Sequence, residues 1–158
     1  VANKPLREMR RVASASLQLE TDLMSDSKTV VFVCVENSNR SQMAEAFARI
    51  HGGSEILACS AGSRPSGRVN PRAIEFMNEL GYDLTQHHSK SLDEFNGQEV
   101  EVAVTMGCGD ECPLVKAKRR EEWQIPDPKD MAPEGYREVR DLIERKVRSL
   151  LASLSSDA

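Results

Sequence analysis

The chain has 158 residues, of which 39% are hydrophobic and 29% are charged, and these values fit one globular domain with a substantial core. No run approaches the roughly 20 apolar residues that a membrane span needs, and none has the pattern of a signal peptide, so we expect a cytoplasmic protein without membrane partners. The formal net charge of -4 argues against nucleic acid as the main partner, but it leaves room for a local cationic site that binds a small anion.

The first segment of the chain, residues 1–28, differs from the rest. It begins with a basic cluster and continues through a Ser-rich stretch to Met24, a residue type that fits a natural start. Its Leu and Val spacing permits a short helix. We therefore expect an N-terminal extension over residues 1–28 and a single catalytic α/β domain over residues 29–158.

Regular elements begin directly after this segment. Residues 29–33 form a continuous β-branched and aromatic run, which is typical of a buried parallel strand. Residues 41–50 carry apolar side chains at helical spacing. Residues 55–60 predict a second strand.

The second half of the chain continues the alternation. Asn70 and Pro71 favour a helix start, and Gly81 fits its end. Residues 100–105 predict a third strand, and residues 122–125 predict a short fourth strand.

A long amphipathic helix is expected last, over residues 134–154. Strands that alternate with helices indicate a four-stranded parallel sheet with helices on both faces. In such sheets the ligand site lies at the carboxyl ends of the strands.

The loop between the first strand and the first helix has the pattern Cys-x5-Arg-Ser, from Cys34 to Ser41. A loop that enters a helix directs several N–H groups at one point, and the helix dipole adds positive potential. Arg40 offers a planar fork for two oxygens of a tetrahedral anion. The same field favours the reactive thiolate of Cys34, and Ser41 can donate a hydrogen bond to it. The alternative is a buried Cys with an Arg paired on the surface, and the strand–loop–helix context favours the catalytic interpretation.

On these residues the chain resembles the low-molecular-weight protein tyrosine phosphatase superfamily and, within it, the arsenate reductases. The resemblance covers about residues 29–154, and its short motifs agree in order and spacing. They are residues 31–45, Ser60-Ala61-Gly62, Ser89-Lys90-Ser91-Leu92, Val104-Thr105-Met106 and Asp127-Pro128.

This resemblance implies a role for each residue of the loop. Cys34 is the nucleophile, Arg40 holds the oxyanion, and Asp127 is the general acid that protonates the departing oxygen. Taken alone, Asp127 before Pro128 is better interpreted as a turn residue, and it is the upstream Cys34 loop that favours the acid. The remaining substrate contacts would come from Val35, Glu36, Asn37, Ser38, Asn39 and Ser41.

Two departures from the family pattern bear on the substrate. Glu36 stands where many relatives have Gly, and a carboxylate in an anion loop must point away from the anion or weaken its binding. Lys129 and Asp130 follow the Asp-Pro pair, where phosphatase relatives often carry aromatic residues that contact a phosphotyrosine ring. The second departure argues against phosphotyrosine as the substrate.

A second pair of cysteines, Cys108 and Cys112, follows the third strand. The resemblance implies that Cys34 attacks arsenate, that a second thiol resolves the adduct, and that a further thiol moves the disulfide outward to an external reductant. We assign Cys108 to the first of these two roles and Cys112 to the second. Thioredoxin, glutaredoxin and a low-molecular-weight thiol all fit that reductant, and a reducing cytosol fits the low cysteine content. The alternatives are structural thiols, half of a metal site, or an acidic turn around Asp110 and Glu111. No bound metal or organic cofactor is expected.

Three functions follow from these residues. The leading one is an arsenate reductase, and the alternative is a low-molecular-weight (tyrosine) phosphatase that hydrolyses phosphomonoesters through a phosphocysteine. The third is an oxyanion-binding module without turnover, which Glu36 would favour. Outside the motifs, Cys59 is expected to be a buried small residue, and His87 and His88 are expected to be a solvated surface pair.

Overall fold

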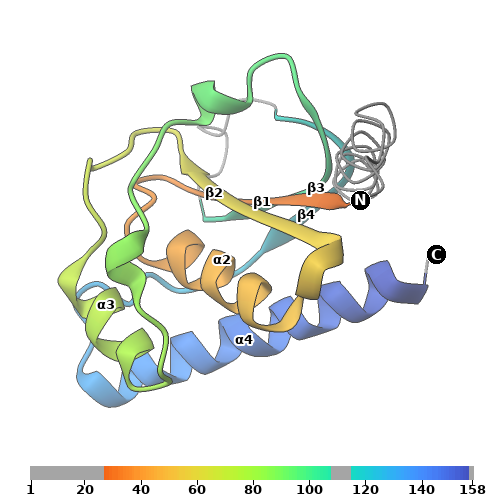
Figure 1. Cartoon of the computed structure of the whole chain (residues 1–158). Coiled ribbons are helices and arrows are strands. Elements are labelled where there is room, and N and C mark those ends of the chain that lie inside the picture. The colour runs from red at the N-terminus through yellow and green to blue at the C-terminus, as the bar shows by residue number, and fades with distance from the viewer. Residues whose placement is uncertain (1–26, 108–114, 157–158) are drawn as a thin grey trace, which may run out of the picture.

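The computed structural model of the protein describes residues 27–107 and 115–156 (Figure 1). Within these ranges four strands form one parallel sheet in the order β2-β1-β3-β4. The strands are β1 (Lys28–Cys34), β2 (Ile56–Gly62), β3 (Glu99–Met106) and β4 (Lys116–Trp123). The α-helices are α2 (Arg40–His51), α3 (Pro71–Asn78) and α4 (Pro133–Ser156). The predicted four-stranded parallel α/β fold is confirmed, whereas residues 1–26 lie outside the described ranges and the extension stays a prediction.

The parallel register brings the carboxyl ends of the three neighbouring strands to one edge. Cys34 at the end of β1 pairs with Gly62 at the end of β2, and β1 also pairs with β3 from Val30↔Val102 onward. The first strand–helix connection therefore lies between two other strand ends. This edge is where the parallel fold places a ligand site.

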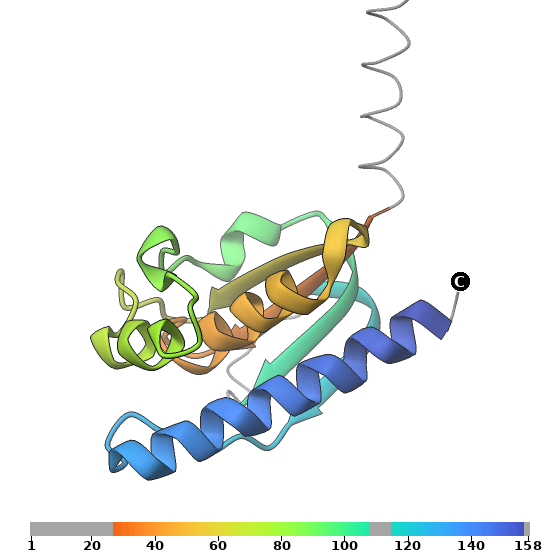
Figure 2. The same ribbon diagram turned by 60° about the horizontal axis from the view of Figure 1, so that its bottom comes forward.

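The two faces of the sheet are covered differently. Val30 and Phe32 of β1 join one core cluster with α2, α3 and α4, which lie together below the sheet in Figure 1. The alternate residues Val31 and Val33 join a second cluster with Leu92. Leu92 belongs to the short 3-10 helix η3 (Leu92–Phe95), which lies on the opposite side of the sheet from α4 in Figure 2. In the described ranges, helical cover on this second face thus comes from η3 and not from an α-helix.

The fourth strand begins and ends earlier than predicted. It runs over Lys116–Trp123, and not over residues 122–125, and it pairs with β3 alone. Its sequence, KAKRREEW, contains no apolar run because an edge strand exposes most of its side chains, and only Trp123 is buried. The apolar pattern typical of a buried strand therefore predicted only the last part of β4.

The other predicted boundaries agree with the structure to within about three residues. At the start of α3 the Asn70 side chain accepts a 2.9 Å hydrogen bond from the N–H of Arg72, as expected of an N-cap. The helix ends at Asn78, before Gly81, whose φ of +80° is the left-handed conformation that glycine favours. None of the helices in the described part of the chain is long and apolar enough to cross a membrane.

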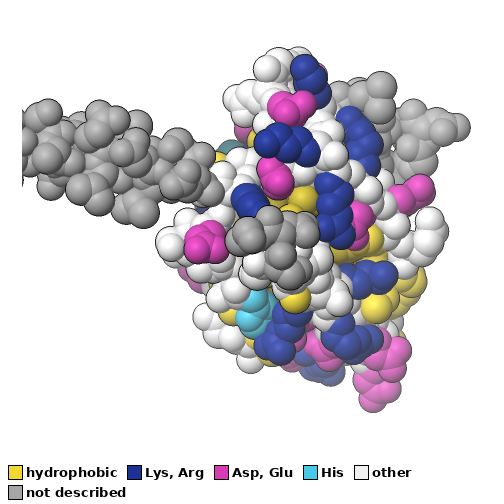
Figure 3. All heavy atoms as spheres, turned by 90° about the vertical axis from the view of Figure 1, so that its right-hand side faces the viewer, with side chains coloured by type: hydrophobic (Ala, Val, Ile, Leu, Met, Phe, Trp, Pro, Cys, Tyr) yellow, Lys and Arg dark blue, Asp and Glu magenta, His cyan; other side chains and the backbone are white. Residues whose placement is uncertain are grey.

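Surface charge is uneven despite the net charge of -4. Lys and Arg side chains gather on the face shown in Figure 3, at the amino ends of the strands. β4 alone contributes Lys116, Lys118, Arg119 and Arg120 to the cationic residues of the molecule. The Cys34 loop lies at the opposite, carboxyl ends of the strands, so its anion affinity depends on local groups and not on this cationic face.

Candidate active site

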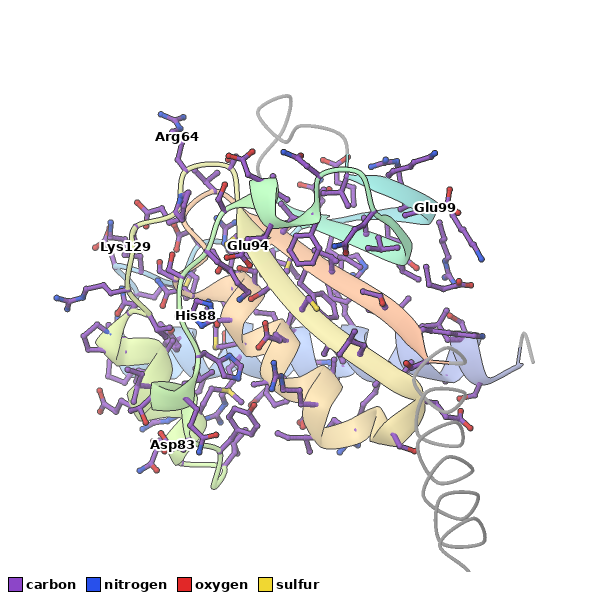
Figure 4. The ribbon with its side chains drawn as sticks, turned by 45° about the horizontal axis from the view of Figure 1, so that its top comes forward. Arg64, Asp83, His88, Glu94, Glu99 and Lys129 are labelled. Carbon is purple, nitrogen blue, oxygen red and sulfur yellow. The ribbon has the colours of Figure 1, made fainter. Side chains whose placement is uncertain are left out.

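The loop from Cys34 to Arg40 forms one wall of a cavity of about 210 Å³ at the carboxyl end of β1. Figure 4 shows two neighbouring loops at this end of the sheet, marked by Arg64 and Lys129. The cavity brings together Cys34, Arg40 and Asp127, which the sequence predicted to act as one site, although Asp127 lies far from the other two in the sequence. Its lining residues are Cys34, Val35, Glu36, Ser38, Asn39, Arg40 and Asp127.

The backbone of this loop is turned so that its N–H groups face the cavity. The carbonyls of Val35, Glu36 and Ser38 accept hydrogen bonds of 2.8 to 3.0 Å from N–H groups of the 63–70 loop. The described peptide bonds are all trans, so each carbonyl points opposite to the N–H of the following residue. The corresponding N–H groups therefore point away from the 63–70 loop, towards the cavity. Several convergent N–H groups of this kind form an anion-binding concavity.

Gly62 allows the loop to lie against β2. A Cβ atom at this position would come within 2.5 Å of the Val35 carbonyl oxygen and 3.0 Å of the Asn37 nitrogen. Any side chain here would push the loop out of shape. The Ser60-Ala61-Gly62 motif therefore shapes the site without contacting the cavity.

Asn37 fixes both the loop conformation and the environment of the thiol. Its φ of +50° is left-handed, a conformation that Asn tolerates better than most residues. Its Oδ1 accepts a hydrogen bond from the N–H of Lys90 at 3.0 Å, so its Nδ2 must be the atom that donates to Ser41 Oγ at 2.8 Å. Because Ser41 receives that bond, its own hydrogen is available to the Cys34 sulfur, 2.8 Å away. This arrangement places the Ser41 hydroxyl so that it can donate a hydrogen bond to the Cys34 sulfur.

Arg40 is held at the side of the cavity by groups from two other segments. Its Nη1 donates to the carbonyl of Ile125 at 3.0 Å, and its Nη2 lies 4.0 Å from Oδ2 of Asp127. Gly107 backs onto the guanidinium: a Cβ atom there would lie 2.5 Å from Nη1, and its φ is +74°. The guanidinium position thus depends on a glycine that the sequence interpretation did not single out.

Asp127 reaches the cavity from the loop before α4. One carboxylate oxygen accepts the N–H of Lys129 at 3.0 Å, and the side chain is 54% exposed, so it can exchange protons with solvent. Arg72 anchors this loop by donating to the carbonyl of Lys129 at 2.9 Å while its guanidinium stacks on the ring of Tyr136. The Asp-Pro pair therefore both makes a turn and places a carboxyl group at the cavity.

Tyr136 connects the last helix to the loop. Its hydroxyl donates to Oδ1 of Asn39 at 2.7 Å, and both residues are buried. Burial raises the pKa of Tyr136 well above its ordinary value, so the hydroxyl remains a neutral donor. Nothing in the local sequence marks this tyrosine, which lies 97 residues from its partner.

A buried polar cluster lies behind the loop, and the sequence did not predict it. Glu45 accepts a hydrogen bond from Ser60 at 2.8 Å and lies 3.5 Å from the ammonium of Lys90. His87 was expected to be a solvated surface residue, and this is wrong: its side chain is 3% exposed, and its Nδ1 lies 3.0 Å from Glu45. His88 is exposed, as expected.

Gln42 links this cluster to the loop. Its Nε2 donates to the carbonyls of Asn37 and His88 at 3.0 Å, which turns its Oε1 towards Nδ1 of His87, 2.9 Å away. An amide oxygen only accepts, so Nδ1 of His87 must carry hydrogen. Burial lowers the pKa of His87 despite the nearby carboxylate of Glu45, and a neutral Nδ1–H tautomer fits this geometry.

We expect Glu45→Gln to lower the free energy of unfolding by about 3 kcal/mol, because it leaves the mostly buried ammonium of Lys90 without its counter-charge. Urea denaturation at neutral pH measures this change. The matched control is Glu144→Gln, which removes the more exposed carboxylate that pairs with His51 at 2.9 Å and is expected to cost less than about 1 kcal/mol. Equal effects of the two substitutions would contradict the structural importance of the cluster.

The remaining cysteines fall into two groups. Cys59 on β2 is half-buried, and burial raises the pKa of its thiol, which keeps it protonated and unreactive. Cys108 and Cys112 lie outside the described residues, so their roles stay predictions. Within the described ranges, no group of three His, Cys, Asp or Glu side chains could hold a metal ion.

A thiol, a ring of N–H groups, an arginine and a carboxyl group around one small cavity define a cysteine-nucleophile enzyme site for oxyanions. Residues 29–158 match the family model described as low molecular weight phosphotyrosine protein phosphatase, and the chain belongs to this family.

Its relatives within this family include arsenate reductases. The chain is 39% identical over 131 residues to the glutaredoxin arsenate reductase of a Synechocystis strain, covering 81% of this chain and 99% of the relative. It superposes with a TM-score of 0.74 on a solved arsenate reductase in a phosphate-binding state, at 38% identity over 80% of this chain and 98% of the other. A thioredoxin-dependent arsenate reductase of Corynebacterium glutamicum gives a TM-score of 0.71 at 29% identity, covering 88% of this chain and 67% of the other.

Proposed function

We propose that this chain is an arsenate reductase that converts arsenate to arsenite through a thiolate–arsenate adduct on Cys34. The observation that carries the proposal is the single cavity that joins Cys34, the inward N–H groups, Arg40 and Asp127. The likeness to arsenate reductases over most of the chain supports the choice of arsenic chemistry.

In the proposed first step the N–H groups and Arg40 hold arsenate, and the thiolate of Cys34 attacks arsenic. A sulfur–arsenic bond forms, and one arsenic–oxygen bond breaks. Asp127, in its protonated form, gives its proton to the departing hydroxyl, which leaves as water. The half-exposed position of Asp127 beside Arg40 supports this role, because the carboxyl group can regain its proton from solvent.

In the second step a further thiolate attacks the sulfur of the Cys34 adduct. A disulfide forms, the electron pair of the sulfur–arsenic bond stays on arsenic, and arsenite leaves. We assign this thiolate to Cys108, which directly follows Gly107. Gly107, the last described residue before Cys108, packs against the Arg40 guanidinium, and this proximity supports the assignment. Cys112 would then attack Cys108, restore the Cys34 thiolate and leave a Cys108–Cys112 disulfide.

The resulting disulfide requires two electrons from outside the chain. We propose a thiol protein of the thioredoxin or glutaredoxin type as the reductant, because similar proteins are described as glutaredoxin and thioredoxin-dependent arsenate reductases. The scheme uses no bound cofactor.

The test is arsenite production from arsenate with each reductant system, for the wild type, Cys108→Ser and Cys112→Ser. We expect steady turnover in the wild type and its loss in both variants, with Cys59→Ser as the active control. Wild-type protein that forms no arsenite but hydrolyses an aryl phosphate would overturn the proposal. It would identify a phosphatase, which needs only Cys34, Arg40 and Asp127.

A further inference from the structure

Glu36 places a carboxylate on the rim of the cavity. Its backbone is fixed there, since its carbonyl accepts hydrogen bonds from the Ser66 N–H at 3.0 Å and from the Ser89 hydroxyl at 2.9 Å. Its Oε2 lies 3.4 Å from the hydroxyl of Ser38, a residue that also lines the cavity. The carboxylate therefore lies beside the anion site, on its solvent-exposed side.

No described cation neutralises this carboxylate. The ion pairs of the described residues do not include Glu36, and Arg40 pairs at 4.0 Å with Asp127 instead. Among the residues that line the cavity, Glu36 thus has no cationic partner, while the single guanidinium of Arg40 lies beside Asp127.

An uncompensated carboxylate at this position discriminates between anions by their charge. Its Coulomb repulsion of a dianion is twice its repulsion of a monoanion at the same distance. A phosphomonoester loses its second proton at a pKa of about 6 and is mostly dianionic at neutral pH. Inorganic arsenate loses its second proton nearer to neutrality, and so a larger share remains monoanionic.

We propose that Glu36 is a specificity-determining residue that disfavours dianionic phosphomonoesters and leaves the cavity to monoanionic inorganic arsenate. The inference rests on the proposed function, because it explains how a phosphatase-type cavity is reserved for arsenate. The Michaelis constant for arsenate then rises as pH increases through neutrality and the dianion replaces the monoanion. The other titratable or charged groups that face the anion during this change are Asp127, Arg40 and Cys34.

The experiment compares Glu36→Gln with the wild type in aryl phosphate hydrolysis and in arsenate reduction with a thiol protein reductant, from pH 6 to pH 8.5. Glutamine keeps the size of the side chain and removes its charge. We expect kcat/KM for the aryl phosphate to rise about tenfold, and that for arsenate at pH 6 to change much less. The rise in KM for arsenate with pH becomes shallower, and the difference between the two proteins shrinks at high salt.

Two further variants make the outcome decisive. Glu94→Gln removes an exposed carboxylate on η3, away from the cavity, and is expected to leave the ratio of the two activities unchanged. If Glu36→Gly raises aryl phosphate hydrolysis while Glu36→Gln does not, side-chain size and not charge sets the specificity, and the inference is overturned. An unchanged ratio in both Glu36 variants also overturns it. Absence of arsenite from the wild type contradicts the proposed function instead, and the aryl phosphate comparison then tests the charge effect alone.

Discussion

Replacing Cys34 with serine is expected to lower arsenate reduction by more than about a thousandfold. A serine hydroxyl remains protonated at neutral pH, so no nucleophile reaches arsenic. Serine also cannot form a disulfide, so the step that leaves the electron pair of the sulfur–arsenic bond on arsenic is lost. The assay is arsenite formation with saturating reductant, corrected for the reductant alone.

Anion binding by the same variant is expected to persist or to tighten. The N–H groups and Arg40 are unaffected by the change, whereas the thiolate charge beside the bound oxyanion disappears. Isothermal titration with inorganic phosphate measures this. Weaker phosphate binding would mean that the sulfur organises the loop and does not act mainly as the nucleophile.

Cys59→Ser is the matched control for this experiment. It makes the same chemical change on β2, where burial keeps the thiol protonated. We expect full reductase activity in this variant, and preferential alkylation of Cys34 over Cys59 by iodoacetamide in the wild type. If activity survives in Cys34→Ser but is lost in Cys59→Ser, the nucleophile is Cys59 and the assignment of Cys34 is wrong.

The loop itself could be predicted from the sequence because its parts are contiguous. Cys34, the five residues after it and Arg40 lie between a continuous apolar strand and a helix whose apolar side chains recur at helical spacing. The fold then follows from the alternation of strands and helices. The edge strand β4 was only partly found because burial, which creates the apolar signal, affects only its last residue.

The supports of the loop could not be predicted in the same way. Glu45 and His87 are 42 residues apart, and nothing in a local pattern distinguishes a buried carboxylate–imidazole contact from two solvated polar residues. The pairing exists because Gln42 on α2 faces the segment after η2 (Leu84–Gln86). Gly107 likewise looks like an ordinary turn glycine until the guanidinium of Arg40 is found against it. Contacts of this kind depend on the packed tertiary structure.

The second large effect is expected from Arg40→Lys, which should reduce kcat/KM for arsenate by about a hundredfold to a thousandfold. The guanidinium can keep its Ile125 hydrogen bond while its remaining N–H groups face the anion. The ammonium of lysine is a single charged group on a shorter side chain, so it cannot bind the Ile125 carbonyl and the anion at the same time. Arsenite formation under reductant saturation gives kcat/KM, and phosphate titration shows whether binding falls with it. Arg145→Lys, an exposed position on α4, is the control and should be fully active.

Gly107→Ala tests whether the position of Arg40, and not its charge alone, carries the effect. The added methyl group would lie 2.5 Å from Nη1, so the guanidinium must move, and the φ of +74° adds backbone strain. We expect a smaller loss than in Arg40→Lys, with the guanidinium still present. In the double variant the two losses should not add, because a lysine at position 40 no longer fills the space that the methyl group requires. Additive losses would show that Gly107 acts independently of Arg40, for example through residue 108, which follows it in the chain.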